Sequence, residues 1–405
     1  MSPSIKKEKI SVCLILTFII IFVSNDTLLF GTNENRVFFW LHVGILLATF
    51  VYIFLHIRSL NKQATFFCTI LVVLMMMTLV INVDIEVIKY IYNIFVILLC
   101  ALFSRYISRQ KFFDSFVLIM YYIAIFAIGL FFLWMVVPQF VRLFPTITNE
   151  SGLTYYYLGL GFLEELGGGV VPRMYGIFRE PGVFTCFLVF ALLIQLYFME
   201  YLNIKRVAVI SLATVLTFST AAYILLFLIL EGYFIKQIFE KKNKHKKVLL
   251  LFFVLAISLA AFFCVIGPER VISLVFNKLN VGNASRDSRF GSVFANFMMF
   301  LKNPILGKGW HYVEDNFIEF ASQGFYKGAH NTNTFLKFLA LYGVIPFLCI
   351  SCANLSFFRK ASKSIFWGIY TTIVWIIALS NEDMTVNILF YLLPLYTFGN
   401  EKERE

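Results

Sequence analysis

The sequence predicts an all-α polytopic membrane protein, and three observations lead to that fold class. Of its 405 residues, 60% are hydrophobic and only 14% are charged, whereas soluble domains average roughly 25% charged residues. The apolar residues gather in runs of about 20, which is the length a helix needs to cross a bilayer. Only short polar breaks separate most of the runs, so we expect one transmembrane domain over residues 1–405.

The apolar runs predict about twelve transmembrane helices. No small-residue cleavage site follows the first run, so we interpret it as a retained helix and not as a signal peptide. The seventh run is short, and the last contains Pro394. The expected spans are 10–24, 36–57, 63–81, 85–104, 113–137, 181–201, 205–218, 221–239, 248–267, 333–357, 365–380 and 387–398.

Basic residues divide unequally between the two sides that these spans define. Lys7, Arg109, Lys242 and Lys360 all fall on one side, whereas the short loops of the other side contain only Arg36. Because cytoplasmic loops carry the excess of Lys and Arg, we expect both termini in the cytoplasm. The formal charge of +11 then follows from membrane topology, and we expect membrane lipid and no nucleic acid as a partner.

Two outer loops, 138–180 and 267–332, are far longer than a helix connection needs, and loops of that length usually carry function. The spans that follow them run from outside to inside, so their N-terminal N–H groups face the outer surface. Pro181 is expected in the first turn of one span, and Asn331 or Thr332 as the N-cap of the other. Each of these helix ends favours an anion.

Charged side chains lie next to both helix ends. Arg173 and Arg179 precede the first, and His330 precedes the second. Arginine forms bidentate hydrogen bonds to phosphate oxygens. The outer surface therefore suits a phosphate group.

The second outer loop contains an expected amphipathic helix over about 289–302. Phe290, Phe294 and Phe297 lie on its apolar face, Arg289 and Asn296 lie on the other, and a proline at 304 stops it. The helix could lie in the membrane interface. Alternatively, Arg289 could point into a pocket above the bundle.

Three motifs in the outer loops carry a family resemblance. They are Arg173-x-x-Gly176-x-x-x-Glu180-Pro181, then Asn303-Pro304-x-x-Gly307-x-Gly309-Trp310 after Arg289, and His330-Asn331-x-x-x-x-Leu336 with Gly343 further on. In order and spacing they resemble the O-antigen polymerase and O-antigen ligase superfamily. The Glu-Pro pair is more similar to the polymerases, since ligases more often have Asn-Pro there. The chain departs from the family at Ser219-Thr220-Ala221, where many members have Ser-Arg.

The resemblance implies a GT-C-like helical bundle that joins undecaprenyl-diphosphate-linked oligosaccharides at the periplasmic face of the bacterial inner membrane. The polymerase reading implies that repeat units become O-antigen or a related surface polysaccharide, with a chain-length regulator protein left open as a partner. The alternative within the class is a ligase that transfers polymer to lipid A-core. An alternative of a different class is a lipid-linked oligosaccharide flippase, but the sequence has neither a polar path across the bilayer nor a detectable repeat.

The resemblance and the residues together assign roles. Arg173, Arg179, Arg286 and Arg289 are expected to bind the diphosphate and stabilise the charge that develops on it. Histidine changes charge near neutral pH, so His330 is the first candidate for the base and Glu180 the second.

Glu180 could instead pair with Arg173 or Arg179 as a brace. Asn331, Pro181 and Gly176 would support the site.

The outer loops contain no Asp-x-Asp or other cluster of metal ligands. We therefore expect a metal-independent glycosyltransferase without a cofactor.

Overall fold

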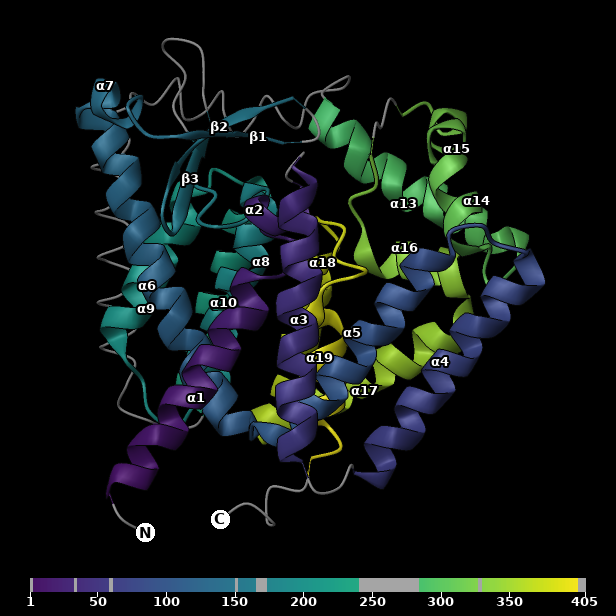
Figure 1. The fold of residues 1–405 in the computed structure, drawn as a ribbon, viewed down its shortest axis with the longest axis horizontal. Helices are drawn as coiled ribbons and strands as arrows, with labels where there is room; N and C mark the ends of the chain where they lie inside the picture. The colour runs from purple at the N-terminus through teal and green to yellow at the C-terminus, as the bar shows by residue number, and fades with distance from the viewer. Residues whose placement is uncertain are drawn as a thin grey trace. The chain divides into compact units, whose positions relative to one another are not determined.

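The computed structural model describes residues 3–32, 35–57, 61–149, 152–164, 173–239, 284–326 and 330–399 (Figure 1). Its contacts divide the chain into two compact units. Unit 1 comprises Met1–Leu47 with Gln110–Val275, and unit 2 comprises Ala48–Arg109 with Phe276–Glu405. The single domain over residues 1–405 stays a prediction.

Unit 1 combines long helices with one small antiparallel sheet in the order β1-β2-β3. The first part of α3 (Arg36–His56) belongs to it, and α8 continues directly into a π-helix. Its other elements are α1 (Pro3–Phe22), α2 (Leu28–Gly31), α6 (Arg109–Val136), α7 (Pro138–Val141), β1 (Thr146–Thr148), β2 (Thr154–Leu158), β3 (Gly161–Glu164), α8 (Pro181–Leu193), the π-helix (Ile194–Phe198), α9 (Ile204–Leu216) and α10 (Thr220–Phe239).

Unit 2 is helical throughout its described residues. Helix α19 packs against α5 and α17, and α13 packs against α15 and α16. Besides the second part of α3, its elements are α4 (Lys62–Asn82), α5 (Val87–Tyr106), α13 (Ala284–Lys302), α14 (Gly309–Asp315), α15 (Phe317–Gln323), α16 (Thr334–Tyr342), α17 (Val344–Ser362), α18 (Ile365–Leu379) and α19 (Ile388–Tyr396).

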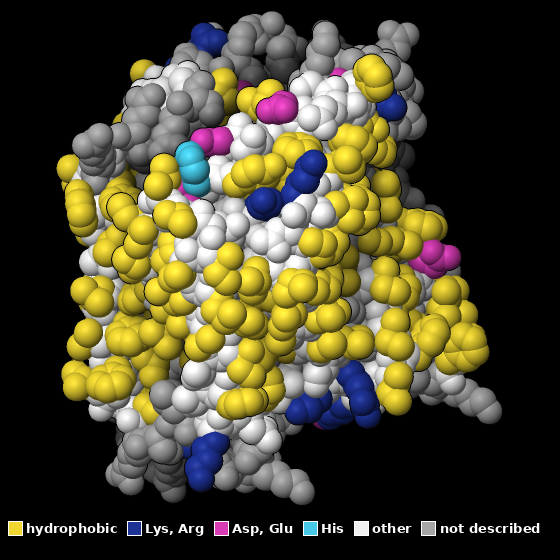
Figure 2. All heavy atoms as spheres, turned by 90° about the vertical axis from the view of Figure 1, so that its right-hand side faces the viewer, with side chains coloured by type: hydrophobic (Ala, Val, Ile, Leu, Met, Phe, Trp, Pro, Cys, Tyr) yellow, Lys and Arg dark blue, Asp and Glu magenta, His cyan; other side chains and the backbone are white. Residues whose placement is uncertain are grey.

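The described residues contain seven helices that are long and apolar enough to cross a membrane: α3, α4, α5, α6, α8 with its π-helix, α10 and α17. Figure 2 shows a face that is hydrophobic across its middle, with most of its charged side chains near the upper and lower borders. A multi-pass, largely helical membrane protein is therefore confirmed. The total of about twelve spans stays a prediction, and the expected span 248–267 lies outside the described residues.

One expected span is wrong as a single helix. Residues 333–357 form two helices, α16 and α17, which Gly343 separates with φ 78° and ψ −174°. This conformation is open essentially to glycine alone. The segment after Pro304 packs against the break, since the N–H of Val344 donates to Pro304 O at 2.8 Å. The residues on both sides of Gly343 are apolar, so the hydropathy of the sequence could not predict the break between the two helices.

Other predicted bounds also change. Helices α9 and α19, with 13 and 9 residues, are shorter than the roughly 20 residues of a full crossing. The amphipathic helix α13 begins at Ala284 and not at 289, and Asp287 lies in its first turn, where an acidic side chain stabilises a helix. The first outer loop, 138–180, contains α7 and the three strands.

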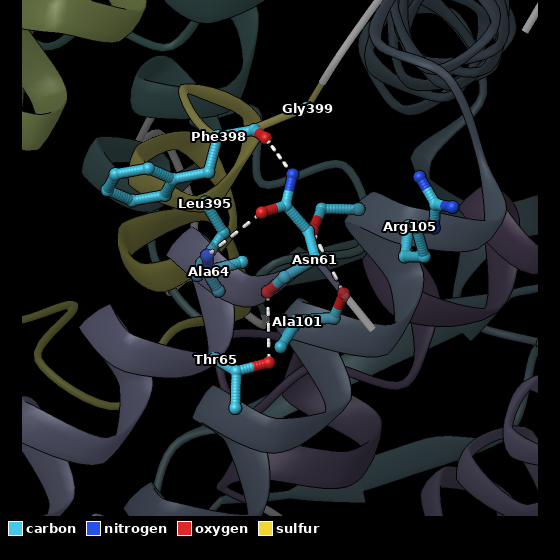
Figure 3. Close-up of a pocket in the computed structure, with 9 residues that line it drawn as sticks. Asn61, Ala64, Thr65, Ala101, Arg105, Leu395, Phe398 and Gly399 are labelled. Carbon is cyan, nitrogen blue, oxygen red and sulfur yellow. Dashed lines mark hydrogen bonds between the residues drawn. The ribbon is translucent and has the colours of Figure 1, made fainter. Parts of the chain in front are cut away.

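A polar side chain joins helix ends within unit 2 (Figure 3). The side-chain nitrogen of Asn61 donates to the backbone oxygen of Phe398, just after α19. Its side-chain oxygen accepts from the N–H groups of Gln63 and Ala64 at the start of α4. One asparagine therefore caps α4 and satisfies a carbonyl at the end of α19.

We predict that Gly343→Ala destabilises the protein by about 3 kcal/mol or more. An added Cβ would lie 2.2 Å from the backbone oxygen of Ile305, and φ is positive. The matched control is Gly129→Ala in α6, where a Cβ meets nothing within 4 Å and alanine favours a helix by about 1 kcal/mol. Thermal unfolding followed by size-exclusion chromatography measures both. Equal midpoints for the two variants would contradict the strained break.

Candidate functional site

The candidate site in unit 1 begins at the sheet. Strands β2 and β3 pair so that Tyr155 lies opposite Glu164. Side chains opposite each other on antiparallel strands share a face. The apolar side chains of Tyr156 and Leu163 pack with Leu130 of α6, so helix α6 supports the strands that carry the polar pair.

The segment that precedes α8 lies beside β3. The N–H of Phe162 donates to Gly176 O at 2.9 Å. Gly176 has φ 56°, and a Cβ there would lie 3.1 Å from the Phe184 ring. Gly176 therefore turns the chain tightly against the first turn of α8. Its supporting role at a substrate site stays a prediction.

That turn brings Tyr175 to the strand pair. The rings of Tyr175 and Tyr155 pack edge to face at 5.4 Å, and the Tyr175 hydroxyl donates to the carboxylate of Glu164. Burial, and then the charge of Glu164, raises the pKa of both tyrosines well above the usual value. Both hydroxyls therefore stay protonated at neutral pH and can act as hydrogen-bond donors.

Arg173 lies beside this cluster, half-buried. Its Nε donates to Thr217 O at 3.3 Å, and the N–H of Met174 donates to Leu216 O. Its charge acts on the hydroxyls of Tyr155 and Tyr175. Within the described ranges no carboxylate forms an ion pair with Arg173.

Arg179 has a different environment. Its backbone N–H donates to Asp26 O at 2.9 Å, and its Nε lies 3.2 Å from Oδ1 of Asp26, whose side chain is only 3% exposed. The N–H of Leu28 also donates to Ile177 O. The residues after α1 are therefore fastened to the segment before α8, and the Arg179 guanidinium holds them.

The N-terminus of α8 follows both arginines in sequence. Pro181 occupies the first turn of α8, as predicted. Glu180 has the N-cap position but makes no side-chain cap bond. Its carboxylate lies 3.6 Å from Nη1 of Arg179, so the structure realises the brace to Arg179 and not the one to Arg173.

A buried hydroxyl follows the carbonyl that Arg173 binds. Ser219 is 1% exposed, and its Oγ has no hydrogen-bond partner among the residues the structure describes. It directly precedes α10. Unit 1 therefore brings together Arg173, the protonated hydroxyl of Tyr155 and the Glu164 carboxylate to which Tyr175 donates, close to the segment before α8. The Arg173 guanidinium and the Tyr155 hydroxyl are the groups of this cluster that can donate to an anion.

In unit 2, the predicted N-cap at Asn331 or Thr332 is wrong. Asn333 caps α16, accepting from the N–H of Leu336 at 2.9 Å. Asn331 instead exchanges two amide hydrogen bonds with Asn296 of α13, at 2.8 and 3.0 Å. The polar face of α13 thus anchors the chain just before α16.

The remaining predicted residues also belong to unit 2. His330 is exposed, and no hydrogen bond joins it to another described residue. The Arg286 guanidinium lies 5.5 Å from the Phe290 ring centroid, and Arg289 is half-buried. The predicted diphosphate ligands therefore divide, with Arg173 and Arg179 in unit 1 and Arg286 and Arg289 in unit 2.

Sequence reasoning missed an ionic cluster in unit 2. Nζ of Lys337, nearly buried on α16, lies 2.7 Å from Asp383 and 3.5 Å from Glu314. Lys89 also pairs with Glu314. The partners of Lys337 are 23 and 46 residues away in sequence, so spacing could not pair them. A lysine on an apolar helix was the available signal.

No three or more His, Cys, Asp or Glu side chains of the described ranges are arranged to hold a metal ion. The cluster around Arg173 contains tyrosine hydroxyls and a guanidinium besides Glu164. Tyrosine and arginine are unusual metal ligands. Metal independence itself stays a prediction.

The pairing of Arg179 with Asp26 predicts the outcome of a double-mutant cycle. Arg179→Ala and Asp26→Ala should each cost about 3 kcal/mol, because each removes one partner of a largely buried ion pair, and the double variant should cost little more than either. Thermal midpoints of the detergent-purified variants measure this. Arg142→Ala, which removes an exposed arginine of the same unit, is the control. Additive losses would contradict a direct pair.

Comparisons with protein-family models, curated proteins and solved structures found no match to this chain. The resemblance to the O-antigen polymerase and ligase superfamily therefore rests on the three motifs. The functional argument rests on the residues around Arg173 and on the membrane-embedded fold.

Proposed function

We propose that this chain is a membrane glycosyltransferase that polymerises undecaprenyl-diphosphate-linked oligosaccharide repeat units into O-antigen or a related surface polysaccharide. The observation that carries the proposal is Arg173, which has no ion-pair partner among the described residues and binds the carbonyl of Thr217, whose hydroxyl is bonded to Thr185 in α8. An arginine beside a helix N-terminus suits a phosphate group. In a protein with several membrane spans, a lipid-linked diphosphate is a substrate that can reach such a site.

The proposed reaction moves a glycan from one lipid diphosphate to another lipid-linked unit. A hydroxyl oxygen of the acceptor attacks the donor sugar at C1, and the C1–O bond to the diphosphate breaks. The electron pair of that bond leaves with the diphosphate, and the hydroxyl proton passes to a base. Arg173 and the Tyr155 hydroxyl would stabilise the negative charge on the leaving oxygen.

Arg179, Arg286 and Arg289 remain proposed diphosphate ligands, although the ion pair with Asp26 favours a bracing role for Arg179. His330 and Glu180 remain the candidate bases. His330 is exposed, and the Glu180 side chain is 43% exposed. A substrate hydroxyl could therefore reach either side chain.

We further propose the bacterial inner membrane as the location, with both termini in the cytoplasm and the active site on the periplasmic face. The positive-inside distribution of lysine and arginine supports this orientation. The partners in this proposal are the lipid-linked donor and acceptor, membrane lipid and, left open, a chain-length regulator protein.

Deletion of the gene tests the function. A surface glycan reduced to one repeat unit indicates a polymerase, whereas accumulated lipid-linked polymer indicates a ligase and a cytoplasm-facing intermediate indicates a flippase.

In the deletion strain, Arg173→Ala should restore polymer about a hundredfold less well than wild type, and Arg173→Lys should restore little because lysine lacks the planar guanidinium of arginine. Both variants should reach wild-type abundance. Normal polymer from both would remove Arg173 from the site.

A second prediction separates the two candidate bases. Removal of a general base typically slows a reaction by roughly 10²- to 10⁴-fold, so His330→Gln should nearly abolish polymerisation by purified protein. Glutamine keeps a hydrogen bond but cannot carry the proton. Glu180→Gln serves as the matched test. Activity lost in Glu180→Gln and kept in His330→Gln would make Glu180 the base.

A further inference from the structure

Unit 2 contains a polar hollow that the proposed chemistry above does not use. Its volume is about 260 Å³, and it lies between the end of α4 and the residues that begin α14. Every residue of its wall carries a hydrogen-bonding side chain. These residues are Asn82, Asp84, Lys308, His311, Tyr312 and Asn316.

The negative charge in the wall belongs to Asp84, whose carboxylate already accepts hydrogen bonds from the protein itself. Asp84 is 7% exposed. Its carboxylate accepts from the Trp310 N–H at 2.5 Å, the Tyr90 hydroxyl at 2.8 Å and the His311 N–H at 3.2 Å. The Glu86 N–H also donates to this carboxylate, at 3.0 Å. These donors stabilise the charge, so Asp84 holds the wall in place.

The positive charge in the wall is more available. Lys308 makes no ion pair with any carboxylate of the described ranges. Its Nζ lies 5.0 Å from the centroid of the Tyr312 ring, which holds it at the wall. The imidazole of His311 pairs with the exposed Asp315 at 3.2 Å. Lys308 is therefore the group that an anionic ligand would meet.

Asn82 and Asn316 each present a side-chain oxygen that can accept a hydrogen bond. The Asn82 side-chain nitrogen donates to Thr78 O at 2.9 Å and to Gly307 O at 3.3 Å. The Asn316 nitrogen donates to Tyr312 O at 2.9 Å. Neither amide oxygen has a partner among the described residues, so each can accept a hydrogen bond from a ligand.

We propose that this hollow binds an acidic monosaccharide residue, with its carboxylate on Lys308 and its hydroxyls donating to Asn82 and Asn316. Free phosphate fits less well, because at neutral pH it offers mainly acceptors, whereas both amide oxygens accept hydrogen bonds. A uronic acid supplies a carboxylate and several hydroxyl donors on one ring. The choice of a sugar as the ligand rests on the proposed function.

The walls are fixed before any ligand arrives. Asn82 is bonded to the backbone before α14, and Asp84 is bonded to the first residues of α14. The N–H of Lys308 also donates to Ala340 O at 2.9 Å. A wall that is already ordered loses less entropy on binding.

The test is ligand-observed NMR on the full chain in lipid nanodiscs, which avoids sugar-headed detergents. The probes are methyl glucuronide, methyl galacturonide, methyl glucoside and inorganic phosphate. At least one uronide should bind about tenfold more tightly than the glucoside. Lys308→Gln should remove this preference, and Lys308→Arg should retain it. Lys302→Gln, which removes an exposed lysine of the same unit, is the matched control.

Three results would overturn the assignment: no binding by folded protein, equal binding of glucoside and uronides, or phosphate displacing the uronide at the same concentration. Binding requires no turnover. A uronide that binds through Lys308, together with a gene deletion that leaves polymer length unchanged, would keep the sugar site and reject the polymerase. Normal polymerisation without uronide binding would do the reverse.

Discussion

A backbone group inside a bilayer must find its hydrogen-bond partner within the protein, and this constraint accounts for much of the structure. At several places where a helix stops or breaks, another part of the same unit supplies the missing donor or acceptor. Arg173 and the N–H of Met174 satisfy carbonyls at the end of α9. Pro304 receives the N–H freed at Gly343, and Asn61 donates to a carbonyl after α19.

This constraint also gives the motif residues a structural meaning. Gly343 permits the break, and the segment after Pro304 fills it. Trp310 donates its backbone N–H to Asp84 and its indole N–H to Tyr342 at 2.7 Å. The motif around Pro304 and Trp310 therefore fastens α14 to neighbouring helices. The residues of a motif that suggests a family can therefore have a structural role, because they satisfy backbone hydrogen bonds.

The sequence predicted what depends on local pattern. Apolar runs located the long helices, and the proline at Pro181 marked the start of α8, because hydropathy and φ preference act over a few residues. It could not predict which arginine is compensated. Asp26 pairs with Arg179 from 153 residues away, whereas Arg173 binds a carbonyl, and in sequence the two arginines are equivalent.

The anchor before α16 contains no formal charge. Asn296 and Asn331 exchange their amide hydrogen bonds, and Ser292 and Thr332 pair through their hydroxyls at 3.2 Å. Neutral amides and hydroxyls do not titrate near physiological pH, and salt screens them little. The residues beside His330 therefore keep their attachment over conditions that change the charge of an imidazole.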